Sequence, residues 1–102
     1  MRENNSADAK GNLLYFPGGI HVKGGDVFVA DSGHNRIKKR YANGTIVTIA
    51  GTGVAGYGGD GGLAINSQLS NPQAVFVHST GEVYIADTNN HRIRKIDGRG
   101  YI

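Results

Sequence analysis

An internal duplication constrains this chain more than any other sequence feature. Residues 26–46 match residues 82–102 without a gap, with eight identities in 21 positions, where about one is expected by chance at average composition. Residues 14–22 continue the match over residues 69–77 after a gap of one residue. A repeat of this kind indicates supersecondary units that bury their apolar surface by stacking on one another. The sequence therefore predicts two such units.

Each unit consists of short apolar segments separated by turn residues. Val27 to Ala30 is apolar on both faces, so both faces of the sheet must be covered. Gly24-Gly25 and Asn43-Gly44 supply hairpin turns. The expected strands are 20–22, 27–30, 36–41 and 45–50 in the first unit, and 74–78, 82–86, 92–96 and a fourth that only begins at 101–102 in the second. The pattern predicts an all-β fold of four-stranded antiparallel meanders.

The composition excludes several kinds of site. The 17 glycines and two prolines among 102 residues agree with many tight turns, and the absence of cysteine removes disulfides, thiolate metal sites and cysteine nucleophiles. The net charge of +3 makes anions only mildly attractive. No segment approaches the roughly 18 apolar residues of a membrane span, and no apolar signal-peptide core is present. We expect no membrane partner and, by default, a cytoplasmic location.

Two segments of the second unit carry a family resemblance. Asn71 to Val75, followed by Gly81 to Ile93, resembles the NHL repeat, and the glycine-rich linker is similar to long inter-blade loops of that family. The resemblance implies β-propeller blades, two per chain. The expected organisation is an N-terminal extension and loop at 1–16, a first blade at 17–50, a glycine-rich inter-blade loop at 51–70, and a second blade at 71–102 with an incomplete outer strand.

The resemblance also implies an assembly and a function. Family domains are usually closed rings of about six blades, so two-blade chains are expected to complete a ring by oligomerisation, with a homotrimer favoured. Family members serve as protein-binding scaffolds, as RNA-binding surfaces and occasionally as metal-dependent lyases. We expect a non-enzymatic scaffold for protein–protein interaction, whose partners are further copies of itself and an unidentified protein. RNA binding and a fragment of a lyase propeller are the alternatives.

A charged motif occurs in both units. An aspartate ends the second strand, where its carboxylate can accept hydrogen bonds from the following turn, and an arginine five residues later can meet it across the hairpin. Since an active site rarely occurs twice in one chain, the motif indicates a structural role. The predicted structural residues are Asp31 with Arg36 and Asp87 with Arg92, together with Pro17 and Pro72 at the start of the units.

Basic residues concentrate on the third strand of each unit. A solvated outer face is their simplest explanation, and a rim that contacts RNA phosphates is the alternative. Aromatic residues that would stack on bases are not interleaved with them. The predicted anion or RNA contacts are Arg36, Lys38, Lys39, Arg92, Arg94 and Lys95.

No cofactor and no metal ion is predicted. Gly51 to Gly56 matches G-x-G-x-x-G, but the glycines that follow cannot begin the helix that a phosphate site requires. His21 and His78 lie on or beside the innermost strands, and a zinc lyase would need further ligands from other blades.

The loop and the N-terminal segment carry two further expectations. The loop 51–70 should have little regular structure, be anchored by Leu69 and be mobile in its glycine-rich half. The apolar residues 13–16 should cover a neighbouring blade or complete the second one.

Overall fold

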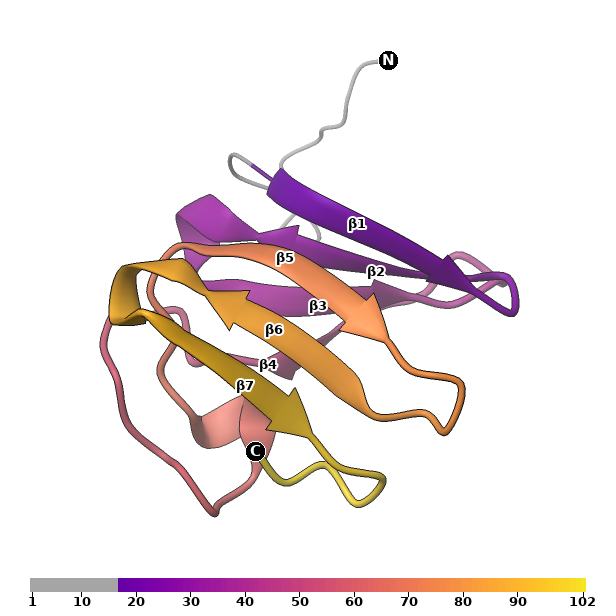
Figure 1. The fold of residues 1–102 in the computed structure, drawn as a ribbon. Coiled ribbons are helices and arrows are strands. Elements are labelled where there is room, and N and C mark those ends of the chain that lie inside the picture. Colours follow the sequence, from indigo (N-terminus) through magenta and orange to yellow (C-terminus); the bar gives the residue numbers. More distant parts are fainter. Residues whose placement is uncertain (1–16) are drawn as a thin grey trace.

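Two antiparallel sheets make up the structure, a computed structural model that describes residues 17–102 (Figure 1). In each sheet the strands follow one another in chain order, as the meander pattern predicts. The prediction for residues 13–16 lies outside the described residues. The first sheet, called the first blade, contains β1 (Pro17–Lys23), β2 (Asp26–Asp31), β3 (Arg36–Arg40) and β4 (Ile46–Ala50), and the second blade contains β5 (Pro72–Val77), β6 (Val83–Asp87) and β7 (Arg92–Ile96).

The two blades repeat the same backbone details. A bulge follows the first residue of β1 and of β5, and those residues lie opposite Asp31 and Asp87. The 3-10 helices η1 (Ser32–His34) and η3 (Thr88–Asn90) join the second and third strands. Each ends at a residue with a left-handed backbone. The duplication in the sequence is therefore a duplication of structure.

One apolar core lies between the two blades. Phe28, Ala30 and Ile37 of the first blade are buried against Val83 and Ile85 of the second. The innermost strands β1 and β5 also lie next to each other (Figure 1). The two sheets thus pack face to face, and each one supplies one of its faces to the shared core.

Two glycines allow the inner strands to approach closely. A Cβ atom on Gly19 would lie 2.8 Å from the Cα atom of Ala74, and one on Gly18 would lie 3.0 Å from the carbonyl oxygen of Gln73. In the repeat alignment, Gln73 and Ala74 are the equivalents of these same glycines. The two units therefore differ in sequence where their backbones meet.

Hydrogen bonds join the turn of the first blade to the start of the second. The backbone amide of Asn71 donates to Asn35 Oδ1 at 2.8 Å, and Ser32 Oγ donates to the carbonyl oxygen of Pro72. Asn71 also has a left-handed backbone, with φ of 52°. The direction in which the second blade begins is thus tied to the first turn.

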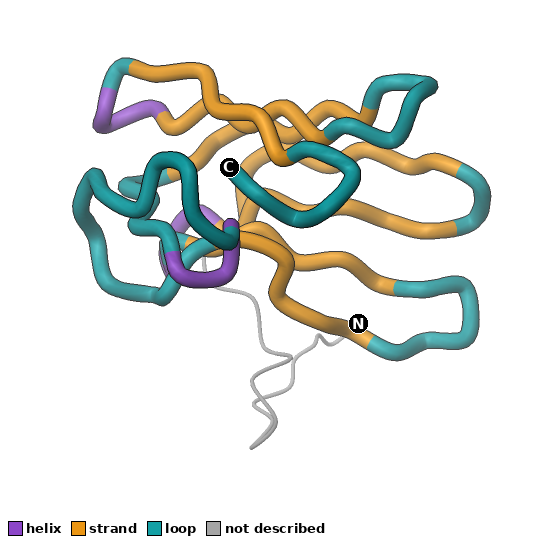
Figure 2. The backbone as a smooth tube through the Cα atoms, turned by 90° about the horizontal axis from the view of Figure 1, so that it is seen from below, coloured by secondary structure: helices purple, strands orange, loops and turns teal. Residues whose placement is uncertain are grey.

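The loop 51–70 is irregular but well connected (Figure 2). Its regular structure consists of the 3-10 helix η2 (Ala64–Asn66) and isolated bridges, and Leu69 is completely buried, as predicted. The amides of Gly56 and Gly61 donate to the carbonyl oxygens of Leu69 and Ile102. These bonds hold backbone that the sequence predicts to be mobile, and its mobility stays a prediction for hydrogen exchange.

The second blade has three strands in the described part of the chain. Beyond β7, Tyr101 forms an isolated bridge with Leu63 of the long loop. No helix in residues 17–102 is long and apolar enough to cross a bilayer.

Candidate functional site

The two carboxylates of the repeated motif are completely buried. Each carboxylate contacts the side chain of the third residue after it. His34 Nδ1 lies 2.7 Å from Asp31 Oδ2, and Asn90 Nδ2 donates to Asp87 Oδ2 at 2.7 Å. The backbone amide of Ser70 also donates to Asp87 Oδ1 at 2.8 Å. The aspartates therefore hold their turns together, which is the structural role that their repetition indicates.

The first unit has His34-Asn35 where the second has Asn90-His91, and the contact with the aspartate is present in both. His34 and Asn90 occupy the same position and both contact the motif carboxylate. The next residue, Asn35 or His91, has φ near 57°, a conformation that asparagine and histidine adopt more readily than most residues. Either order of the two residues thus gives the same turn.

The prediction that Arg36 and Arg92 form ion pairs with Asp31 and Asp87 is wrong. Asp31 lies opposite Arg36 and Asp87 opposite Arg92 in the strand register, but the ion pairs go to basic residues two positions further on. Lys38 Nζ lies 3.4 Å from Asp31, and Arg94 Nη1 lies 3.5 Å from Asp87. Arg36 instead donates to the carbonyl oxygen of Thr52 at 3.1 Å. A buried carboxylate needs a charged or hydrogen-bonding partner, and the buried Lys38 and Arg94 provide it.

Arg94 also fastens the long loop to the second blade. Its guanidinium donates to Gln68 O at 2.7 Å, to Gly58 O at 3.2 Å and to Asp60 at 2.7 Å. It lies 4.9 Å from the centre of the Tyr57 ring. We call Tyr57, Asp60 and Arg94 the loop clasp. Sequence reasoning missed it, although a basic residue seven positions after each motif aspartate was a detectable signal.

The clasp lowers the pKa of the Asp60 carboxyl below its ordinary value of 3.8. The largest cause is the hydrogen bond that the Tyr57 hydroxyl donates to the carboxylate, and the next is the hydrogen bond from Arg94. Both bonds favour the ionised carboxylate. The clasp therefore favours the charged form of Asp60.

The predicted anion contacts are divided between the interior and the surface. Lys38 and Arg94 are buried in ion pairs, so burial removes them from an RNA-binding surface. Lys39 lies between the Phe28 and Tyr41 rings and 3.8 Å from Asp26. The others lie nearer the surface: Arg36 bonds to Thr52, Arg92 lies over Tyr57, and Lys95 lies 3.6 Å from Glu82. An RNA contact by these four residues stays a prediction.

The two inner-strand histidines have different neighbours. The His21 ring packs edge-on against Phe76 with 4.9 Å between ring centres, and His78 Nδ1 lies 3.0 Å from Thr80 Oγ1. Among residues 17–102, no three histidine, aspartate or glutamate side chains gather as metal ligands would. The described residues therefore do not bring the two histidines into a shared site.

In residues 17–102, each blade has one face covered by the other blade and one face, called its open face, on which apolar side chains are exposed. On the open face of the second blade, Ile93 is 73% exposed, whereas its repeat equivalent Ile37 is 0% exposed. On the open face of the first blade, Ile20 is 66% exposed, whereas its equivalent Val75 is 7% exposed. The open faces are thus positional copies of the faces that are buried within the chain.

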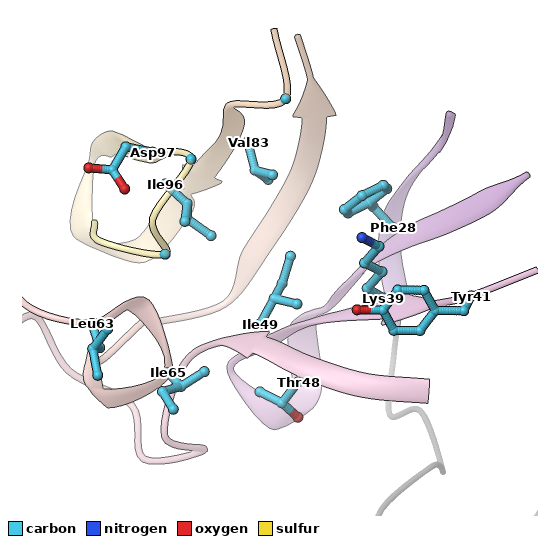
Figure 3. A pocket seen from close by; sticks show the side chains of 13 residues that line it. Phe28, Lys39, Tyr41, Thr48, Ile49, Leu63, Ile65, Val83, Ile96 and Asp97 are labelled. Carbon is cyan, nitrogen blue, oxygen red and sulfur yellow. The ribbon is translucent and has the colours of Figure 1, made fainter. Parts of the chain in front are cut away.

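A groove of about 490 Å³ opens between the outer parts of the blades (Figure 3). One wall contains Phe28, Lys39 and Ile49 from the first blade, and the other contains Val83 and Ile96 from the second. Leu63 and Ile65 of the long loop border it. The groove is therefore mixed in character, with apolar side chains on both walls and Lys39, Thr48 and Asp97 as its polar residues.

The repeat can now be compared with known families. The model of the NHL repeat matches residues 14–39 and 69–96, which together are more than half of the chain. The chain belongs to the NHL repeat family. Protein SUPPRESSOR OF QUENCHING 1, chloroplastic, from Arabidopsis thaliana is 34% identical over 96 residues, which cover 93% of this chain and 9% of that protein. NHL repeat-containing protein 2 from Gallus gallus is 40% identical over 87 residues, covering 82% of this chain and 11% of that protein.

The chain thus spans about a tenth of the length of these NHL relatives. Among solved structures, virginiamycin B lyase from Staphylococcus aureus aligns with a TM-score of 0.59 and 19% identity, over 82% of this chain and 24% of that one. At this identity the likeness concerns the fold alone. The predicted all-β fold of propeller blades is confirmed.

Proposed function

We propose that this NHL chain is a non-enzymatic scaffold for protein–protein interaction that assembles from two-blade chains through its open faces. One observation supports the proposal above all others: each open face repeats, position by position, a face that is buried inside the chain. The packing of the second blade on the first within the chain therefore serves as a model for the contact between two chains.

The open face of the first blade has the apolar character that the next contact requires. Ile20 and Val22 are the repeat equivalents of Val75 and Val77. Val75 and Val77 are buried where the second blade packs on the first. The open face of the first blade can therefore pack on a blade of another copy in the way that the second blade packs on the first.

The open face of the second blade supplies the complementary surface. Tyr84 and Ile93 stand where the first blade has Phe28 and Ile37, and both of the latter are buried. Docking this face on the open face of another copy is a head-to-tail contact, which leaves no open face only when a ring closes. Six blades, the number that the family resemblance implies, correspond to three chains.

The non-enzymatic part of the proposal has separate support. The repeated carboxylates, Asp31 and Asp87, are buried and engaged in ion pairs, so they do not face a substrate. The RNA alternative has less support because Lys38 and Arg94 are buried as well. The scaffold is the function that the geometry favours.

Sedimentation or light scattering of the purified chain tests the assembly. We expect a species of three times the 10.8 kDa chain mass at micromolar concentration, and we expect Ile93→Asp to reduce it to a monomer. Val54→Asp is the control, since Val54 is also exposed, at 61% against 73% for Ile93, but lies on the long loop outside both sheets. A folded wild-type monomer, or an unchanged mass for Ile93→Asp, would contradict the proposal.

A further inference from the structure

A second cavity lies between the two blades, on the side of the innermost strands. Its volume is about 290 Å³. The first blade contributes Asp26 and Phe28 of β2 and Lys39 of β3, and the second contributes Val77 of β5 and the Gly81 turn. In the described residues β2 and β3 are paired on both sides, and the β5–β6 hairpin is closed. The cavity is therefore a property of the contact between the blades.

The chemistry of this cavity depends on Lys39. Its side chain is only 23% exposed, and its ammonium lies 5.2 Å from the centre of the Phe28 ring and 4.6 Å from that of Tyr41 (Figure 3). The Asp26 carboxylate is 3.8 Å away, beyond hydrogen-bonding distance. An ammonium has three donors, and within residues 17–102 no acceptor bonds to those of Lys39. A largely buried cation thus lacks an acceptor.

The charges around the cavity favour an anion with a single charge. Lys23 and Lys39 border it together with Asp26, an excess of one positive charge. The Asp26 carboxylate also accepts the backbone amide of Ala42 at 3.1 Å, so part of its charge is used within the first blade. A carboxylate would satisfy the Lys39 ammonium through charge-assisted hydrogen bonds. The RNA backbone, in contrast, needs several cations along its path.

The size and the rim of the cavity suit one side chain. Pockets for whole small molecules measure about 300–1,000 Å³, and this cavity lies at the lower limit of that range. Gly24 and Gly81 of two hairpin turns border it and are exposed, and a Cβ atom on either glycine would meet nothing within 4 Å. The walls are the buried Phe28 and Val77. A side chain can therefore enter between the turns and pack its methylene groups against these walls.

We propose that this cavity binds the side chain of one glutamate from a partner protein. The carboxylate accepts hydrogen bonds from the Lys39 ammonium, and the methylene groups of the glutamate pack between Phe28 and Val77. Tyr41 is 38% exposed beside Lys39, so an apolar residue next to the glutamate is favoured. Side chains that fill desolvated pockets contribute much of the affinity of protein interfaces. The inference rests on the scaffold function and names the side chain by which the scaffold recognises its partner.

The test uses the blocked peptide acetyl-Gly-Leu-Glu-Leu-Gly-amide, titrated into the full chain labelled with ¹⁵N. We expect one peptide per chain, with shifts concentrated in the amides of Gly24, Phe28 and Gly81. The same peptide with glutamine in place of glutamate should bind roughly tenfold more weakly, because it lacks the charge that Lys39 requires. Added salt should weaken only the glutamate peptide. This comparison uses the wild-type chain and does not depend on the folding of a variant.

Two protein variants locate the binding. Lys39→Met keeps a long side chain against the two rings and removes the charge, so it should bind both peptides equally and as weakly as the wild type binds the glutamine peptide. Lys95→Met is the matched control, because Lys95 is the repeat equivalent of Lys39, lies 3.6 Å from Glu82 and does not line the cavity. It should bind the glutamate peptide as the wild type does.

Several outcomes would overturn the glutamate site. They are equal binding of the two peptides by the wild type, shifts away from the cavity, no shift at millimolar peptide, or wild-type binding by Lys39→Met. A short RNA oligomer of mixed sequence that shifts the same amides when the peptide does not would also overturn it. Sedimentation of the same samples separates the two proposals. An assembled chain without a preference for the glutamate peptide refutes the cavity site alone, and a monomer that has this preference refutes the assembly alone.

Discussion

The two blades have nearly the same backbone and opposite patterns of burial. Ile37 is a core residue of the first blade, whereas Ile93, the same residue type at the same position of the repeat, faces outward from the second. The reverse holds for Ile20 and Val75. Residue type therefore does not decide which side chains form the core here. The place of a blade in the stack decides it, because each blade covers one face of its neighbour.

The blades also differ where they contact something other than a blade. Lys38 and Arg94 occupy the same position and each reaches its motif aspartate. Arg94 in addition holds the long loop through Gln68, Gly58 and Asp60. An arginine has a planar group with five donors, whereas a lysine has a single ammonium group. The guanidinium of Arg94 thus reaches Asp87 and the acceptors of the long loop at the same time.

The largest expected effect comes from removing this charge. Arg94→Met leaves Asp87 buried without its ion pair and should lower the free energy of unfolding by about 3–5 kcal/mol, as measured by denaturant unfolding. Arg94→Lys copies the first blade, keeps a cation near Asp87 and should recover part of that loss. If both variants lost the same amount, the loop contacts and not the ion pair would carry the stability.

Truncation of the two equivalent isoleucines should separate the blades most clearly. Ile37→Ala removes a completely buried side chain and should cost about 2–5 kcal/mol. Ile93→Ala should cost less than about 0.5 kcal/mol at dilutions where the chain is monomeric, and more as the concentration rises and copies assemble. Unfolding curves at several protein concentrations provide the measurement. A large cost at every concentration would mean that the open face of the second blade is already covered.

The inner strands offer a smaller test. Gly19→Ala puts a Cβ atom 2.8 Å from the Ala74 Cα atom, and the required shift of β1 against β5 should cost about 1–3 kcal/mol. Gly98→Ala is the control, because nothing lies within 4 Å of the added atom and the equivalent position in the first blade holds alanine. Thermal unfolding should show a lower Tm for the first variant only. Equal Tm values would show that the strands adjust without cost.

The smallest expected effect is a faster amide exchange of the long loop at acidic pH. The pKa of Asp60 is lowered in the folded chain, so its contribution is complete above the ordinary value of 3.8 and is lost as the pH falls through the lowered value. We expect the amides of Gly56 and Gly61 to exchange faster in this acid range, relative to the amides of the first blade. Asp60→Asn should remove the difference. An unchanged ratio in the wild type would show that the clasp does not hold the loop.

The stacked meanders could be predicted from the residues, and the resemblance to the NHL repeat supplied the propeller. Eight identities at one spacing, the turn glycines and strands that are apolar on both sides indicate stacked meanders, and the structure has them. Which residues of each blade are buried was harder to predict, because Ile37 and Ile93 occupy equivalent positions and have similar neighbours in the sequence. Their difference depends on which neighbour is present, which no local pattern encodes.

The motif was predicted in its residues but not in its pairing. Arg36 and Arg92 lie directly opposite the aspartates, as a hairpin requires, yet both side chains have other neighbours, Thr52 O and the Tyr57 ring. These neighbours belong to the long loop, whose path the sequence does not specify. For the same reason Arg94 resembled a surface cation. A charge that is buried by a glycine-rich loop leaves little trace in strand periodicity.

The bonds between the first turn and the second blade determine curvature. Asn71 and Pro72 are held by Asn35 and Ser32, so these polar contacts help to set the rotation from one blade to the next, together with the apolar core. Closed propellers of about four to eight blades need rotations of about 90° to 45°. A change at Asn35 would therefore alter the angle while leaving the apolar faces intact. Chains with matching faces and the wrong angle would continue as an open spiral instead of closing.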